Sequence, residues 1–223
     1  SDTLFVYSDP GTIFVDNLLL VIRIILILVT TILNSIIIII ILFVIKKKTY
    51  TNILFLSMAS ADFTIGLFCI PFMTINLYLK WWPLGYHMCL FWIINDYSGC
   101  VLSIISLFLL TLQRFRQIVL PTRTSESLTK IKILILILIW LLCYLLWSTC
   151  AILIMPIAYP LYGCLLTYTL AYNLLSIIVP AICPAIGIIL INLLIIISIR
   201  LKKSKFSNKK NFKSSQIRNR RVE

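Results

Sequence analysis

Charged and catalytic residue types are scarce in this chain. Only 12% of its 223 residues are charged, and it contains a single histidine. There is no paired metal-ligand spacing, no glycine-rich phosphate loop and no nucleophile elbow, and His87 lies in a predicted loop. We therefore expect the protein not to be an enzyme and to have no catalytic residue, and we expect no cofactor beyond the ion considered below.

Hydrophobic residues make up 61% of the chain, whereas a soluble domain has about 45–50%. Five apolar runs each exceed the roughly 20 residues that a membrane-spanning helix needs. They cover residues 17–45, 53–79, 90–112, 131–155 and 169–199. The runs show no period-two alternation, so we expect helices rather than a barrel. The predicted fold class is an all-α transmembrane helical bundle in a lipid bilayer.

Basic residues gather on one predicted side of the membrane. Eighteen of the 20 lie after the first run, between the third and fourth runs, or after the fifth. The positive-inside rule makes this side cytoplasmic. We expect residues 1–16 to be extracellular, 17–199 to form the membrane domain and 200–223 to be a basic cytoplasmic tail, disordered on its own. Topology and anionic lipid account for the charge, so we expect no nucleic-acid partner.

Two acidic residues, Asp62 and Asp96, lie inside apolar runs. A charge at membrane depth costs at least about 2.5–3.5 kcal/mol, so each needs a counter-ion, a ligand or a proton. Asp96 follows Cys89 by seven residues, and Arg114 follows Asp96 by 18, or five helical turns, so both charges share one face. We expect this face to line the bundle interior, with Asp96 either free for a cationic ligand or paired with Lys80 or another helix.

Aromatic residues and two cysteines lie near the level of Asp96. Tyr97 and Trp147 can line a pocket for an ammonium group, although aromatic residues also form belts at the membrane interface. Cys89 and Cys164 fall at the outer ends of spans, where oxidation allows a disulfide. From topology alone, a disulfide and two free thiols both remain open.

Several motifs occur in a fixed order along the chain. They are Asn34, LSMASAD ending at Asp62, WPLG at 82–85, Cys89, Asp96, QRF at 113–115, Trp140, Cys164 and Pro184. The set resembles the first five helices of the seven-helix rhodopsin-like G-protein-coupled receptors, and among them receptors for amines. WPLG, the Asp96–Tyr97 pair and Trp147 look most like muscarinic acetylcholine receptors, and the stretch FWIINDYSGC also looks like histamine receptors.

The resemblance implies roles for individual residues. Asp96 would bind the amine nitrogen, with Tyr97, Cys100, Trp147 and Ser176 shaping the pocket, although a lone helical serine such as Ser176 is usually structural. It also implies that Gln113, Arg114 and Phe115 meet a heterotrimeric G protein. Asp62 and Ser103 match the family's sodium ligands; the alternative is a protonated Asp62. Cys89 and Cys164 match its disulfide, and the location would be the plasma membrane.

The chain departs from the family pattern in two respects. Gln113 replaces the acid that precedes the arginine, so we expect a weaker restraint on the resting state. The motifs CWxP and NPxxY of helices six and seven are absent, so residues 200–223 resemble the start of the third intracellular loop. We expect these 223 residues alone not to signal. The alternatives are a truncated receptor that associates with full-length partners, or an ion- or proton-coupled transporter.

Overall fold

The structure is a computed structural model that describes residues 10–119, 130–162, 164 and 182–219. Its elements are, in chain order, α1 (Pro10–Ile39), the π-helix η1 (Ile40–Val44), α2 (Tyr50–Thr64), the π-helix η2 (Ile65–Cys69), α3 (Ile70–Leu79), α4 (Gly85–Val119), α5 (Lys130–Tyr162) and α7 (Cys183–Asn219). The described residues form five segments long and apolar enough to cross a membrane. The predicted helical membrane bundle is thus confirmed.

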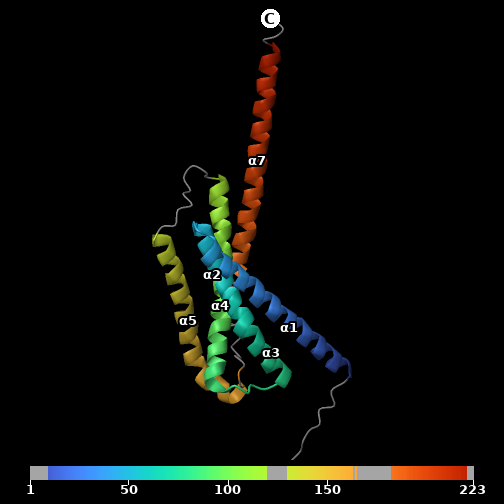
Figure 1. Ribbon diagram of the computed structural model, residues 1–223, viewed down its shortest axis with the longest axis vertical. Coiled ribbons are helices and arrows are strands. Elements are labelled where there is room, and N and C mark those ends of the chain that lie inside the picture. Colours follow the sequence, from blue (N-terminus) through green and yellow to red (C-terminus); the bar gives the residue numbers. More distant parts are fainter. Residues whose placement is uncertain (1–9, 120–129, 163, 165–181, 220–223) are drawn as a thin grey trace, which may run out of the picture.

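The helices extend beyond the apolar runs at several ends. The first begins at Pro10, where the missing N–H and the fixed φ of proline suit a first helical turn. Thr49 caps α2, because its hydroxyl accepts a hydrogen bond from the Asn52 backbone N–H at 3.3 Å. The expected disorder after residue 199 is not observed: α7 continues to Asn219 and projects beyond the other helices (Figure 1). Adding residues to an existing helix needs no new nucleus, and this segment has no glycine or proline.

The second membrane segment is one helix with a widened turn in the middle. Pro71 lacks the N–H that would close a regular turn, and η2 lies immediately before it. Gly66, within η2, lies against α1: a Cβ there would be 2.9 Å from the Thr31 hydroxyl oxygen. Proline and glycine therefore explain where this helix changes its register and how closely α1 approaches.

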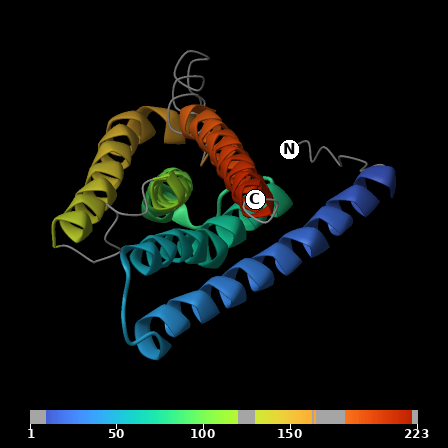
Figure 2. The same ribbon diagram turned by 90° about the horizontal axis from the view of Figure 1, so that it is seen from above.

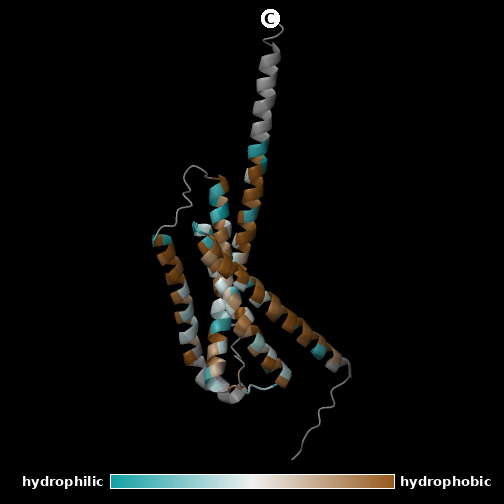
Figure 3. Ribbon diagram, viewed as in Figure 1, coloured by the Kyte–Doolittle hydropathy of each residue, from teal (hydrophilic) through white to brown (hydrophobic). Residues whose placement is uncertain are grey.

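The helix α4 forms the centre of the bundle. It contacts α2, η2, α5 and α7, and the view from above shows it between them (Figure 2). Two buried clusters pack against it, one near its N-terminal end around Cys89 and Ile93 and one near its basic C-terminal end around Leu54, Leu110 and Leu136. The surfaces of α1, α5 and the membrane part of α7 are apolar and exposed, as expected for helices in lipid (Figure 3).

Candidate functional site

Asp96 is half-buried on the continuous helix α4. It lies seven residues, or about two turns, after Cys89. Among the residues that the structure describes, none forms an ion pair or hydrogen bond with its carboxylate. Lys80, the cation that sequence reasoning offered as a partner, instead lies 3.7 Å from the carboxylate of Asp16, and both of these side chains are exposed. The alternative of a Lys80–Asp96 pair is therefore not observed.

Tyr97 and Trp147 form a stacked pair that joins α4 to α5. Their ring centroids are 4.6 Å apart and their planes are inclined by 24°. Trp147 is buried and Tyr97 is half-buried. The structure thus brings these two predicted residues together, and Tyr97 directly follows Asp96 in the chain.

Cys100 lies one turn below Asp96 on α4, and its thiol is exposed. A further thiol, Cys69 of η2, is buried. Sequence reasoning treated Cys69 as an ordinary apolar residue; its spacing of seven from Asp62 was the available signal.

Aromatic rings fill the space between the second membrane segment and the outer part of α4. Phe91 packs edge-on against Phe68 and Phe72, with centroids 5.6 and 6.3 Å apart. Phe72 also meets Trp82 edge-on at 6.0 Å. Phe68 and Phe72 were not predicted as site residues, because phenylalanines within an apolar run carry no signal of which way they face.

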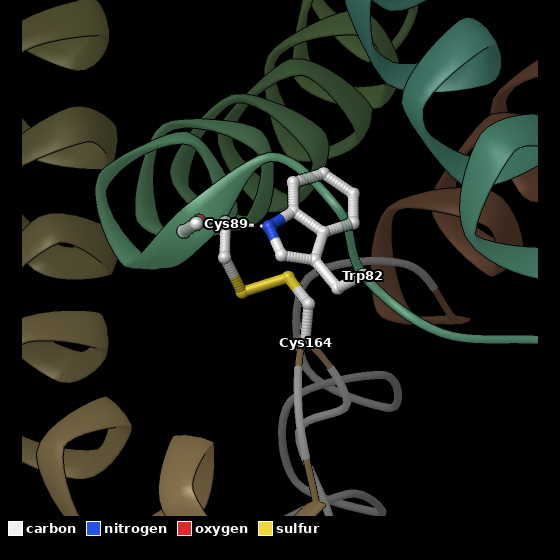
Figure 4. The surroundings of a disulfide bond; sticks show 4 residues. Trp82, Cys89 and Cys164 are labelled. Atoms are coloured by element: carbon white, nitrogen blue, oxygen red, sulfur yellow. Dashed lines mark hydrogen bonds between the residues drawn. A yellow bond between two sulfur atoms is a disulfide. The ribbon is translucent and has the colours of Figure 1, made fainter.

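A disulfide lies at the end of the bundle where α4 begins. Cys89 in the first turns of α4 is bonded to Cys164, with the two Cα atoms 5.6 Å apart (Figure 4). Trp82 lies beside this bond, and its indole N–H donates to the Gly85 carbonyl oxygen at 2.7 Å. Gly85 has φ +75°, a conformation that glycine adopts without strain. The disulfide expected from the resemblance is present, and the turn before α4 is fixed by it and by Trp82.

The second carboxylate, Asp62, lies on α2 where that helix touches α4. A Cβ on Gly99 would lie 3.0 Å from Ile65 Cγ1 and 3.8 Å from the Ala61 carbonyl oxygen, so the helices cross closely here. Asp62 follows Ala61, and Ser103 lies one turn after Gly99. Both are half-buried, and neither side chain has a hydrogen bond or ion pair with the described part of the chain.

At the basic end of α4 the three predicted residues face different surroundings. Gln113 is buried, Arg114 is exposed and Phe115 is half-buried. Beyond them, Lys202 of α7 donates to the Ile118 carbonyl oxygen in the last turn of α4. Ser176 lies outside the described residues.

A family model described as "7 transmembrane receptor (rhodopsin family)" matches residues 33–222. The chain belongs to the rhodopsin family of seven-transmembrane receptors. It is thus a multi-pass membrane protein of a receptor family, which agrees with the expectation that it is not an enzyme.

Histamine H1 receptors are among the similar proteins. The bovine receptor (Bos taurus) is 31% identical over 109 residues, 46% of this chain and 22% of that receptor. The receptor of Cavia porcellus is 35% identical over 101 residues, which cover 45% and 21% of the two chains. The human receptor is 34% identical over 85 residues, 38% and 18%. The matched segments therefore span about a fifth of these relatives.

Proposed function

We propose that this chain is the ligand-binding part of a plasma-membrane receptor for a small cationic amine, with its N-terminus outside. The observation that carries the proposal is the carboxylate of Asp96, which has no cation among the described residues although it lies at membrane depth. An amine arriving from outside would supply the missing charge. The similarity to histamine receptors supports an amine of that kind, and the motifs shared with muscarinic receptors keep acetylcholine as a second ligand to test.

The neighbours of Asp96 suit an ammonium group. The stacked rings of Tyr97 and Trp147 can present π-electron density to a cation, which contributes about 0.5–2 kcal/mol when water is excluded. Cys100, one turn from Asp96 on α4, and Ser176 would complete the pocket. These four residues would shape and orient the ligand, while Asp96 would hold its charge.

The same helix would carry the signal to a heterotrimeric G protein at its other end. Arg114 is exposed there, while the buried Gln113 beside it can donate or accept a hydrogen bond but offers no charge. Phe115 adds a half-buried ring to the same surface. Between the two ends, the oxygen atoms of Asp62 and Ser103 suit a hard cation such as sodium, which would neutralise the Asp62 carboxylate when bound.

The proposal is tested with the receptor expressed from its full coding sequence. We expect Asp96→Asn to weaken the binding of a radiolabelled amine at least about 100-fold, because the ligand cation would be left unpaired in a desolvated site. Asp16→Asn is the matched control, since that exposed acid lies beside Lys80 and not in the proposed pocket, and binding should stay within about twofold. Equal surface levels establish that both variants fold. Unchanged amine affinity in Asp96→Asn would overturn the proposal.

A further inference from the structure

Two contacts join α4 to α5 near Asp96, and the pocket proposed above uses only one of them. The first is the stacked pair of Tyr97 and Trp147, with ring centroids 4.6 Å apart. The second is a hydrogen bond, in which the Tyr144 hydroxyl of α5 donates to the Asn95 side-chain oxygen at 3.3 Å. Neither Asn95 nor Tyr144 belongs to the ligand pocket or to the G-protein surface described above.

The two contacts lie on either side of Asp96 around the axis of α4. Successive residues of an α-helix are about 100° apart, so Asn95 and Tyr97 are displaced from Asp96 by equal angles in opposite directions. A helix that touches both must lie on the side of α4 opposite Asp96, and α5 runs along one side of α4 (Figure 2). Ser98, about 200° from Asp96, is fully buried, as expected for the side that α5 covers. The helix α5 therefore holds α4 with Asp96 turned away from it.

The hydrogen bonds of Asn95 allow its amide one orientation. The amide nitrogen donates to the Phe91 backbone carbonyl oxygen at 2.7 Å, one turn earlier in α4. A carbonyl oxygen only accepts, so the nitrogen has to face Phe91, and the side-chain oxygen is left for the Tyr144 hydroxyl. Asn95 is only 9% exposed, so a rotated side chain would leave buried polar atoms unpaired. The amide thus links the Tyr144 hydroxyl to the backbone of α4.

The Tyr144 hydroxyl is itself held in place from the second membrane segment. The Tyr144 ring is stacked on Trp140, with centroids 6.2 Å apart and planes inclined by 24°. The Trp140 indole N–H donates to the Ser57 hydroxyl of α2 at 2.9 Å. A chain of contacts thus runs from α2 through two aromatic residues of α5 to the residue that precedes Asp96.

We propose that Tyr144 is a positioning residue for the amine site: its hydrogen bond to Asn95 fixes the rotation of α4 and with it the direction of the Asp96 carboxylate. The inference rests on the proposed binding of an amine by Asp96. A binding group has to be held within about 0.5 Å and 10–20° of its productive geometry by the residues that support it. The stacked rings alone do not supply this precision, because aromatic faces can slide over each other, whereas a hydrogen bond specifies both a distance and a direction.

The test uses the full-length receptor with histamine and acetylcholine as probes, each measured beside its neutral carbon isostere. Tyr144→Phe removes one oxygen atom and keeps the ring that stacks on Trp140. We expect amine affinity to fall about three- to tenfold, the range for one neutral hydrogen bond. Isostere affinity should stay within about twofold, because a neutral ligand gains little from the direction of a carboxylate. Tyr78→Phe is the matched control at an exposed tyrosine of α3 and should leave both affinities unchanged.

Two further variants separate this inference from the proposed function. Asn95→Ala removes the acceptor instead of the donor; it should lower amine affinity selectively even if Tyr144→Phe does not reach the cell surface, and adding Tyr144→Phe should cause no further loss. In Asp96→Asn the carboxylate is absent, so Tyr144→Phe should again add nothing. Unchanged amine affinity in Tyr144→Phe, or equal losses for amine and isostere, would overturn the positioning role alone, provided that Asp96→Asn abolishes amine binding. Unchanged amine affinity in Asp96→Asn would overturn the proposed function as well.

Discussion

The helices α4 and α7 are similar in length, at 35 and 37 residues, yet they differ in how many of their residues are buried. The first buries ten residues, and five of these are polar: Asn95, Ser98, Ser106, Thr111 and Gln113. In the membrane part of α7 no described side chain is buried, and Asn192 is exposed. Both helices are apolar enough to span a membrane, so hydropathy alone does not distinguish the central helix from the peripheral one.

The difference shows that small and polar residues place a helix within a membrane bundle. Lipid solvates apolar side chains as well as a protein interior does, so association depends on close packing and on interhelical hydrogen bonds. The helix α4 has both, through Gly99 against α2 and through Ser106 in its hydrogen bond to Ser57. It also carries Asp96, whose charge would be costly in free energy on a face exposed to lipid.

The largest effect should come from bulk at the helix crossing. Gly99→Val places a branched side chain where Ile65 already lies 3.0 Å from the Cβ position, so we expect destabilisation by about 1–3 kcal/mol. The matched change in α7 is Ala185→Val at an exposed position, which should be within ±0.5 kcal/mol or so. Thermal unfolding of the purified receptor measures both. Equal unfolding midpoints for the Gly99→Val and Ala185→Val variants would contradict the proposed difference between the two helices.

A smaller effect should follow loss of one interhelical hydrogen bond. Ser106→Ala removes the partner of Ser57, and we expect a cost of about 0.6–1.7 kcal/mol in the membrane. In α7, Ser198→Ala should cost less, because no interhelical bond of that serine is present in the described structure. The same unfolding assay applies, and a larger loss for Ser198→Ala would contradict the account.

The smallest effect concerns the contact between α7 and the end of α4. Lys202→Gln removes a cation from the last carbonyl groups of α4, which should cost about 0.3–1 kcal/mol. Hydrogen exchange of the peptide that covers residues 114–119 should accelerate, while in Lys203→Gln it should not. If both variants exchange alike, the Lys202 contact does not hold this helix end.

Part of this arrangement could be predicted from the sequence because it depends on period and spacing. The five spans follow from the lengths of the apolar runs, and a continuous α4 keeps Asp96, Cys100 and Arg114 in the predicted register. The Cys89–Cys164 disulfide was predicted through the resemblance and is present.

The remainder depends on features that a single sequence does not display. The end of a helix is set by its cap and by continued propensity rather than by the lipid boundary, so Pro10 and Asn219 were not predicted as ends. The π-helical turn of η2 alters which residues of the second segment face α4. That change of register was not predictable from Pro71 alone.

The central claim is that Asp96 is reserved for the charge of an external ligand. A double-mutant cycle tests it most directly, with a cationic amine and its neutral carbon isostere each measured against the full-length receptor and its Asp96→Asn variant. The account predicts that the isostere binds both receptors alike, while the amine loses at least about 100-fold in the variant. Equal losses for the charged and neutral ligands would show that Asp96 acts on the fold and not on the ligand charge.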